Sequence, residues 1–87
     1  MPYEIVDLPK AQRDYLRWAR SDRRMIDKID ELVEDMKSDP YTGIGKPEQL
    51  KYDFAGFWSR RITEQHRILY EVHDEVILVH RYFGHYK

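Results

Sequence analysis

The spacing of apolar residues changes after Asp39–Pro40, and this change constrains the fold more than any other feature of the sequence. Between residues 9 and 38 the apolar positions recur every three or four residues, whereas from residue 50 onward they tend to alternate. The first spacing is typical of one helix face and the second of a half-buried strand. The chain is therefore expected to form helices first and most of a sheet afterwards.

Two helices are expected before the change. The first begins at Pro9 and carries Ala11, Tyr15, Trp18 and Ala19 on one face, and the second runs from about Arg23 to Ser38. The second stripe consists of Met25, Ile26, Ile29, Leu32, Val33 and Met36. Ser21–Asp22 marks the break, because either side chain can cap the following helix. Asp39–Pro40 ends the second helix, because the residue before proline disfavours helical geometry.

Five strands are expected around these helices. A short edge strand is predicted at Pro2–Leu8, and four more strands at Leu50–Phe54, Trp58–Thr63, Arg67–Val72 and Val76–Phe83. One strand, two helices and four strands favour an α+β domain, with both helices on one face of an antiparallel sheet. The other face is then left to water or to a partner.

Length and composition narrow the class of protein. Eighty-seven residues predict one domain over 1–87, and the absence of cysteine excludes disulfides and thiolate metal ligands. The longest apolar run, Val76–Val79, is far short of the roughly 20 residues of a membrane span. A soluble, cytoplasmic protein without membrane contact is therefore expected.

The charge is unevenly distributed. The formal net charge is −1, which argues against a general attraction to nucleic acid. Residues 1–40 carry ten acids and eight bases, a net charge of −2, whereas residues 41–87 carry six acids and seven bases, a net charge of +1. Basic side chains in the second half therefore need a local reason.

Strand alternation divides the side chains of the sheet between its faces. If Ile62, Ile68 and Tyr70 face the helices, Arg61 and Arg67 must point to the open face. Arg60 does not fit this pattern and is expected to extend along a sheet edge.

The last hairpin sets the distance between Arg67 and the end of the chain. A turn near Asp74–Glu75 places Arg67 opposite Arg81 or Tyr82. His85 would then lie about 10 Å further along, at roughly 3.3 Å per residue.

Glu48, Arg67 and His85 can converge on this open face. A carboxylate can take the proton from a ribose 2′-hydroxyl, and an imidazole can protonate the departing 5′-oxygen. An arginine can stabilise the charge that gathers on the phosphoryl oxygens. These are the groups that a metal-free ribonuclease needs, and the products would be a 2′,3′-cyclic phosphate and a 5′-hydroxyl.

Each of these residues also has a purely structural interpretation. Glu48 can be a loop carboxylate paired with Lys46 or Lys51, and the arginines can be solvated charges on a sheet face. Residues 85–86 can be a frayed terminus, and Phe57 and Trp58 can belong to the core. His66, His73 and His80 lack a tight metal-ligand spacing, so neither a metal site nor a cofactor is expected.

Three segments resemble one known family. G-K-P-E-Q-L-K at residues 45–51, G-F-W-S-R-R-I-T-E-Q-H-R-I-L-Y at 56–70 and G-H-Y at 84–86 are similar to the YoeB/Txe branch of the RelE/ParE toxin superfamily. A weaker resemblance extends through both predicted helices, so it covers nearly the whole chain.

The resemblance implies a toxin of a bacterial toxin–antitoxin pair that enters the ribosomal A site and cuts messenger RNA during translation. Glu48 matches the family's general base, Arg67 its phosphate stabiliser and His85 its general acid, while Tyr86 matches its terminal tyrosine and completes the catalytic set. Lys51 and Arg61 match basic residues near the scissile phosphate. Lys46 and Trp58 complete the expected RNA-binding set.

The resemblance also implies a fold and partners. The family fold is a microbial-ribonuclease-like sheet that carries two helices, and the usual partner is an antitoxin of the YefM/Phd type. Its acidic and apolar segment could cover Trp58, Arg61 and Arg67. Members of the family also form homodimers.

Two other functions fit the same fold. One is a binding toxin without RNA chemistry, as in the gyrase-poisoning ParE branch, for which a loop glutamate and a terminal histidine would have no use. The other is a degenerate partner that binds an antitoxin and only regulates its own operon.

Overall fold

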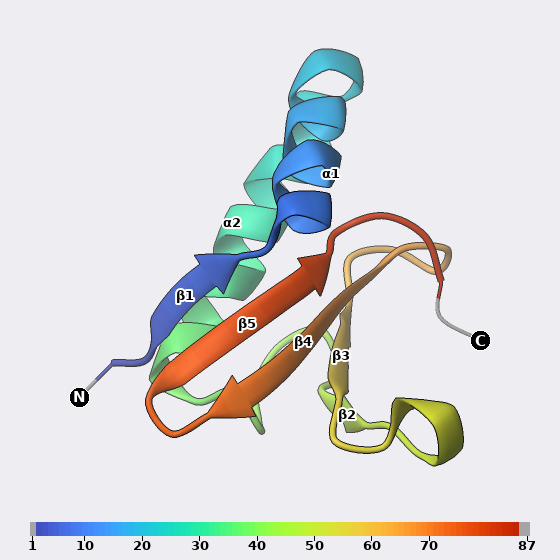
Figure 1. Cartoon of the computed structure of the whole chain (residues 1–87). Helices are drawn as coiled ribbons and strands as arrows, with labels where there is room; N and C mark the ends of the chain where they lie inside the picture. Colours follow the sequence, from blue (N-terminus) through green and yellow to red (C-terminus); the bar gives the residue numbers. More distant parts are fainter. Residues whose placement is uncertain (1, 86–87) are drawn as a thin grey trace.

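Two helices lie against one face of a five-stranded sheet in the computed structural model, which describes residues 2–85 (Figure 1). Along the chain the elements are β1 (Glu4–Asp7), α1 (Pro9–Ser21), α2 (Arg23–Ser38), β2 (Glu48–Gln49), the 3-10 helix η1 (Tyr52–Phe54), β3 (Trp58–Arg61), β4 (Arg67–His73) and β5 (Val76–Arg81). Within residues 2–85, no helix is long and apolar enough to cross a membrane.

The strand order is β1-β5-β4-β3-β2, so β1 lies at an edge as predicted. Strands β2 to β5 pair antiparallel, whereas β1 runs parallel to β5, with Ile5 opposite Ile77. The α+β class with both helices on one face is confirmed. The sheet is mixed rather than wholly antiparallel, because alternation in a sequence carries no information about the direction in which an edge strand joins.

The helices follow the predicted boundaries. Asp22 separates them, and its side chain accepts a hydrogen bond of 3.1 Å from the backbone N–H of Arg24, which caps α2. Asp39 ends α2, next to Pro40. The regular apolar stripe of α2 is buried at Ile26, Ile29, Leu32 and Met36.

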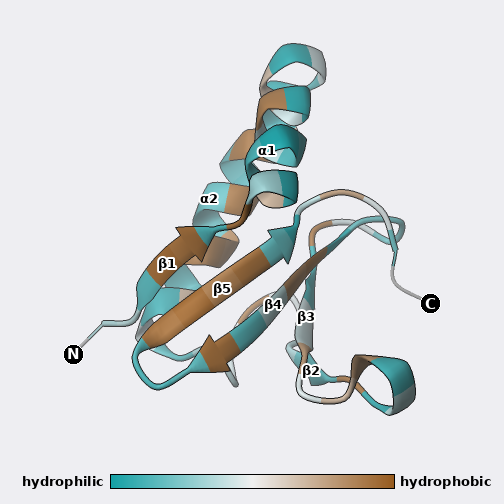
Figure 2. Cartoon of the chain, in the orientation of Figure 1, coloured by the Kyte–Doolittle hydropathy of each residue, from teal (hydrophilic) through white to brown (hydrophobic). Residues whose placement is uncertain are grey.

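The main core lies between the helices and one face of the sheet. Ile62, Ile68 and Tyr70 are buried there, as the alternation predicts, together with Ile77 and Val79 of β5. Figure 2 shows β1 and β5 as largely hydrophobic strands, while the segment around η1 is mixed. The core therefore gathers beneath the helices, and the other face of the sheet remains available for polar groups.

The predicted strand at Leu50–Phe54 is wrong. The chain leaves the sheet after Gln49, and Tyr52 has a φ of 56°, which an extended strand does not allow. Leu50 is 7 % exposed whereas Tyr52 is 91 % exposed, so the two residues do not share a buried face. The alternation of Leu50, Tyr52 and Phe54 imitates a strand, but turn hydrogen bonds such as Phe54 N–H to the Lys51 carbonyl (3.1 Å) shape this segment instead.

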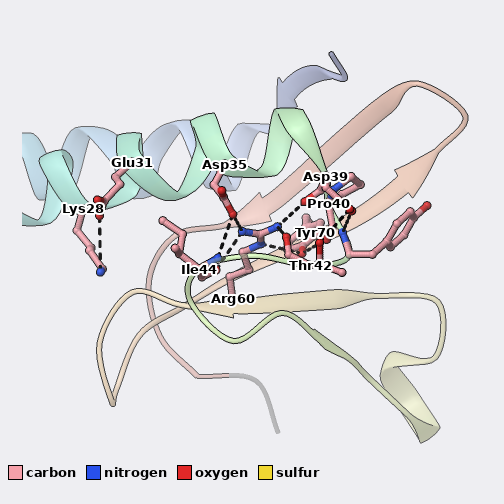
Figure 3. Close-up of polar contacts among 10 residues, drawn as sticks. Lys28, Glu31, Asp35, Asp39, Pro40, Thr42, Ile44, Arg60 and Tyr70 are labelled. Atoms are coloured by element: carbon pink, nitrogen blue, oxygen red, sulfur yellow. Dashed lines mark hydrogen bonds and ion pairs between the residues drawn. The ribbon is translucent and has the colours of Figure 1, made fainter. Parts of the chain in front are cut away.

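Arg60 is the largest departure from the sequence prediction. Its side chain is completely buried rather than extended along an edge. Its Nη1 lies 2.6 Å from Asp35 Oδ2 on α2, and its Nε donates to the hydroxyl of Tyr70 at 3.3 Å. Its Nη1 and Nη2 also donate to the backbone carbonyls of Asp39, Thr42 and Ile44 (Figure 3).

This guanidinium fixes the loop that leads to β2. Asp35 reinforces the arrangement by accepting the backbone N–H of Ile44 at 3.0 Å. Gly43 has a φ of 124°, and a Cβ at this position would overlap the Asp35 carboxylate, so the loop needs glycine there. The path of the chain between α2 and Glu48 is therefore set by a buried charge.

Substitution of Arg60 by methionine is expected to lower the free energy of unfolding by about 3 kcal/mol or more, because it leaves a carboxylate and several carbonyls without their partner. Urea denaturation measures the change. Arg61→Met is the matched control, since Arg61 is the exposed neighbour, and it should change stability by no more than about 0.5 kcal/mol. Equal stabilities of the two variants would contradict the structural role of Arg60.

Stability should also fall in acid because of Asp35. The hydrogen bond from Arg60 and that from the Ile44 N–H hold the pKa of Asp35 below its usual value. The folded state thus binds this proton less readily than the unfolded state, so the contribution is complete above about pH 4 and is lost as pH falls below it. The urea midpoint can be measured from about pH 7 down to about pH 2.5, a range that brackets the usual aspartate pKa of about 4. As the pH is lowered, the midpoint should fall less steeply for Asp35→Asn than for Asp27→Asn, an exposed control on α2.

Candidate active site

Three of the predicted site residues share the open face of the sheet. Glu48 pairs with Ser59, Ser59 pairs with Leu69, and Arg61 pairs with Arg67. Paired residues, and residues two apart on one strand, project to the same side. Glu48, Arg61 and Arg67 therefore lie on the face opposite Ile62, Ile68 and Tyr70, as the alternation predicts.

The register also gives the separation of Glu48 and Arg67. Two strand spacings of about 4.8 Å and an offset of two residues place their Cα atoms roughly 12 Å apart. Both side chains are long, and the exposed Glu48 lies at the rim of the sheet on β2. A ligand group between them can be reached from both sides.

The guanidinium of Arg67 is held by backbone carbonyls. Its Nη1 donates to Thr63 O at 2.6 Å and to Glu64 O at 2.9 Å, with a longer contact to His66 O. Nε and Nη2 have no hydrogen bond within the described residues, and neither is a buried unsatisfied atom, although Arg67 as a whole is buried, with 8 % of its surface exposed. Arg67 is thus oriented by one nitrogen, and Nε and Nη2 are left without a partner in the described residues.

Arg61 and Arg67 form a cross-strand pair of like charges. Such a pair is unfavourable by itself. The nearest compensation for Arg61 is Glu64, whose carboxylate oxygen lies 3.9 Å away and whose side chain is 90 % exposed. Two guanidinium groups side by side favour the binding of an anion at this point.

The end of the chain lies closer to Arg67 than predicted from a regular hairpin, in which Arg67 would lie opposite Arg81 or Tyr82. A bulge between Leu69 and Tyr70 of β4 shifts the register, so that Leu69 pairs with Arg81. The Arg67 N–H donates to Gly84 O at 2.9 Å, so the partner of Arg67 is neither Arg81 nor Tyr82. The register after the bulge places Phe83 opposite Arg67, so the extra residue accounts for one position of the difference, and the bond to Gly84 lies one residue further along. The exposed His85 therefore follows directly after the residue that is bonded to Arg67.

Buried polar groups hold this last segment against α1. Asp14 accepts the backbone N–H of Tyr82 at 3.0 Å, and the indole N–H of Trp18 donates to the Tyr82 carbonyl at 2.8 Å. Nδ1 of His66 accepts the N–H of Gly84 at 2.9 Å. The approach to His85 is therefore tied to α1 at Tyr82 and to the residue before β4 at Gly84.

The basic residues predicted to bind RNA lie along the same side of the site. Lys46 is exposed and follows Gly45, whose carbonyl accepts the N–H of Arg61 at 2.7 Å. Lys51 lines a pocket of about 390 Å³ formed by residues 48–54, which also includes Glu48. Lys46, Lys51 and Arg61 can thus contribute positive charge around Glu48.

Two of the predicted site residues stand apart. Trp58 pairs with Tyr70 and shares its face, is partly buried against the core, and lies 5.1 Å from the ring of Tyr41. Trp58 therefore does not share the open face with Arg61 and Arg67, the residues that an antitoxin was expected to cover together with it. Tyr86 lies outside the described residues.

The sequence interpretation missed Asp14 and His66. Nothing in the spacing of either residue signals its role, because their partners are 68 and 18 positions away along the chain. Arg60 did leave a signal, since a charged residue on an otherwise apolar face requires a buried counter-charge. Within residues 2–85, no three His, Cys, Asp or Glu side chains are placed to hold a metal ion together.

Comparison with known proteins identifies the class to which this fold and site belong. Residues 8–86 match the family model described as the YoeB-like toxin of bacterial type II toxin–antitoxin systems. Toxin YoeB of Escherichia coli strain K12 is 49 % identical over 73 residues, which cover 84 % of this chain and 87 % of the relative.

Solved structures agree with this match. A YoeB/ParE toxin from Agrobacterium tumefaciens superimposes with a TM-score of 0.90 at 41 % identity, covering 95 % of this chain and 99 % of the other. YoeB in a heterotetrameric complex with YefM from Staphylococcus aureus gives 0.87 at 37 % identity, and a YoeB dimer from the same organism gives 0.88 at 37 %, each covering 99 % of this chain and 100 % of the other.

The fold is thus that of a toxin of the RelE/ParE superfamily. The chain belongs to the YoeB-like toxins of bacterial type II toxin–antitoxin systems. The resemblance noted in residues 45–51, 56–70 and 84–86 is confirmed.

Replacement of Gly84 by alanine tests how the last segment is held. Gly84 has a φ of 91° and Gly56 a φ of 93°, and an added Cβ at either position meets nothing within 4 Å. Both alanine variants should lose stability by about 1 kcal/mol or somewhat more from backbone strain alone. Only Gly84→Ala should reduce the exchange protection of the Arg67 amide, measured by NMR. Unchanged protection in that variant would contradict the described contact.

Proposed function

We propose that this chain is a ribosome-dependent endoribonuclease that cuts messenger RNA in the A site, without a metal ion, and so inhibits translation. The proposal is supported by membership of the YoeB-like toxin family, by the shared sheet face of Glu48, Arg61 and Arg67, and by the position of His85 directly after the residue bonded to Arg67.

In the proposed reaction Glu48 acts as the general base. Its carboxylate takes the proton from the ribose 2′-hydroxyl, and the 2′-oxygen forms a bond to phosphorus. The bond from phosphorus to the 5′-oxygen breaks, and the leaving oxygen receives a proton from the imidazolium of His85. The products are a 2′,3′-cyclic phosphate and a 5′-hydroxyl, and the enzyme is left with a protonated Glu48 and a neutral His85.

Arg67 is proposed to stabilise the negative charge that develops on the phosphoryl oxygens. The observation that carries this role is its hydrogen-bonding pattern: Nη1 is fixed on the Thr63 and Glu64 carbonyls while Nε and Nη2 have no partner within the described residues. Donors that are oriented before the reaction need no reorganisation as the charge grows. Arg61 adds a second positive charge directly across the strand pair.

RNA contacts beyond the reacting phosphate are proposed for Lys46, two residues before Glu48, for Lys51, which lines the same pocket, and for Arg61, on the same sheet face. Tyr86 is proposed as a further catalytic residue on the family resemblance alone. Because Trp58 packs on the helix side, it is a weaker candidate for an RNA contact than these three basic residues.

We also propose that a YefM/Phd-type antitoxin binds this chain and covers the basic open face, by analogy with the YoeB–YefM complex of Staphylococcus aureus. Arg61 and Arg67 offer charge complementary to an acidic segment. A homodimer is proposed on the same basis, from the YoeB dimer of that organism.

Single substitutions in the proposed acid and base should abolish most of the cleavage. Glu48→Gln and His85→Gln each remove one proton-transfer group with little change in shape, and a loss of roughly 10²-fold or more in rate is expected. Primer extension on messenger RNA bound to purified ribosomes locates the cuts and gives the single-turnover rate. Arg67→Lys should also lower this rate, because lysine lacks the planar fork of donors.

Arg23→Ala, an exposed residue at the start of α2, serves as the control and should keep the parent rate. Parent-like cleavage by Glu48→Gln or His85→Gln would show that the assigned acid and base are wrong. Growth arrest with intact message would instead favour the non-catalytic binding toxin, and absence of toxicity would favour the antitoxin-binding regulator.

A further inference from the structure

His66 and Arg67, which are neighbours in the chain, form hydrogen bonds with two adjacent peptide groups of the last segment. Nδ1 of His66 accepts the N–H of Gly84 at 2.9 Å, and the N–H of Arg67 donates to the carbonyl of Gly84, also at 2.9 Å. The second of these peptide groups is the one that carries the nitrogen of His85. The segment that leads into His85 is thus held at Gly84 by both hydrogen bonds.

The first of these bonds requires a neutral imidazole. A peptide N–H can only donate, so Nδ1 of His66 must present a lone pair and the ring proton must be on Nε2. Protonation of Nδ1 would set two donors against each other at this contact and break the bond.

The ring of His66 is held by packing as well. Its centroid lies 4.9 Å from the ring of Trp18 in an edge-on arrangement and 4.6 Å from the ring of Phe83. The guanidinium carbon of Arg17 lies 3.6 Å from the centroid of Phe83 on the other side of this cluster. Three segments, α1, the start of β4 and the end of the chain, therefore meet at this one ring.

We propose that His66 is a positioning residue for His85: its neutral ring holds the Gly84 peptide so that His85 stays beside Arg67, and protonation of the ring releases the end of the chain. The inference rests on the proposed acid role of His85 and deepens it. His66 itself touches no reacting atom in this scheme.

The charges around the ring favour its neutral form. Burial, with the positive charge of Arg17 on α1 as a second cause, holds the pKa of His66 below its usual value of about 6.5. Arg67 on β4 adds a cation in the adjacent residue, and Glu64, in the turn before it, is mostly exposed. On the side of the last segment the titratable group that follows Gly84 is His85.

The two histidines would then need opposite protonation states. His85 must carry a proton to act as the acid, whereas His66 must lack one to act as the acceptor. The cleavage rate should therefore decline in acid as His66 becomes protonated, in addition to any effect on the base. Because the pKa of His66 is lowered, this decline should lie below about pH 6.5.

Two variants of His66 separate its acceptor from its packing. In His66→Asn the side-chain oxygen can replace Nδ1 as an acceptor that does not titrate, while the aromatic contacts are lost. In His66→Phe the aromatic contacts can remain while the acceptor is lost. His73→Asn is the matched control, because His73 ends the strand that begins directly after His66, has a 59 % exposed side chain and bonds only Glu71 within the described residues.

The inference is tested by single-turnover cleavage on programmed ribosomes at saturating ribosome concentration. The pH is varied from about 5 to about 8, which brackets the usual histidine pKa of about 6.5. His66→Phe should lower the rate constant roughly 10²-fold without a matching change in the concentration that gives half-maximal rate, because it misplaces a reacting group rather than weakening binding. His66→Asn should recover most of this loss and shift the decline in acid to lower pH. His73→Asn should follow the parent.

The NMR signals of His66 and the Gly84 amide give a readout that does not depend on activity. In the parent, the ring should carry its proton on Nε2 at neutral pH, and the shift and exchange protection of the Gly84 amide should change with the titration of His66. A parent-like rate and pH profile in His66→Phe would overturn the inference. So would a Gly84 amide whose chemical shift and exchange protection do not change when His66 titrates.

Failure of the proposed function would look different. A parent that leaves programmed ribosomes uncut, while the Gly84 amide still follows His66, would refute the ribonuclease reaction and with it the role of His66 in placing the acid. A parent that cuts, together with a Gly84 amide insensitive to His66, would refute only the positioning role.

Discussion

The buried guanidinium of Arg60 is the interaction on which the arrangement of this fold depends. A charge with no exposed surface must be satisfied from within the protein. Here the partners come from Asp35 on α2, the hydroxyl of Tyr70 on β4 and three carbonyls of the connecting loop. One side chain thereby joins a helix, the sheet and a loop, and the loop delivers Glu48 to the edge of the open face.

A second set of buried polar contacts performs the same task at the other end of the chain. Asp14 and Trp18 on α1 bind the backbone of Tyr82, and His66 binds that of Gly84. The first set fixes the loop that leads to Glu48, and the second fixes the segment that leads to His85. In both cases, polar contacts with the helices or with the strand connections fix a loop or terminal segment that carries a candidate site residue, Glu48 or His85. The contacts that stabilise the fold therefore also position the candidate site.

Much of this could be predicted from the sequence. The regular stripe of α2 and the capping residue Asp22 predicted both helices, because local periodicity and capping need no distant partner. Alternation placed Arg61 and Arg67 on the open face for the same reason. The same rule failed at Leu50–Phe54, where three alternating apolar residues lie in a turn. At Arg60 the alternation itself was correct, because this side chain lies on the helix face. The spacing did not indicate that a carboxylate on α2 would pair with it.

The sequence by itself determined the class of the domain, the order of its elements and the residue types available for acid–base chemistry, since these follow from local patterns and from motifs that resemble a family. Only the tertiary structure decided that Arg60 is a structural rather than a surface charge, that a bulge shifts the last strand so that Arg67 bonds Gly84, and that His66 is bonded to the segment before His85. Each of these depends on contacts between residues 10 or more positions apart or on a shift in strand register. Local spacing contains neither, because packing between distant segments selects them.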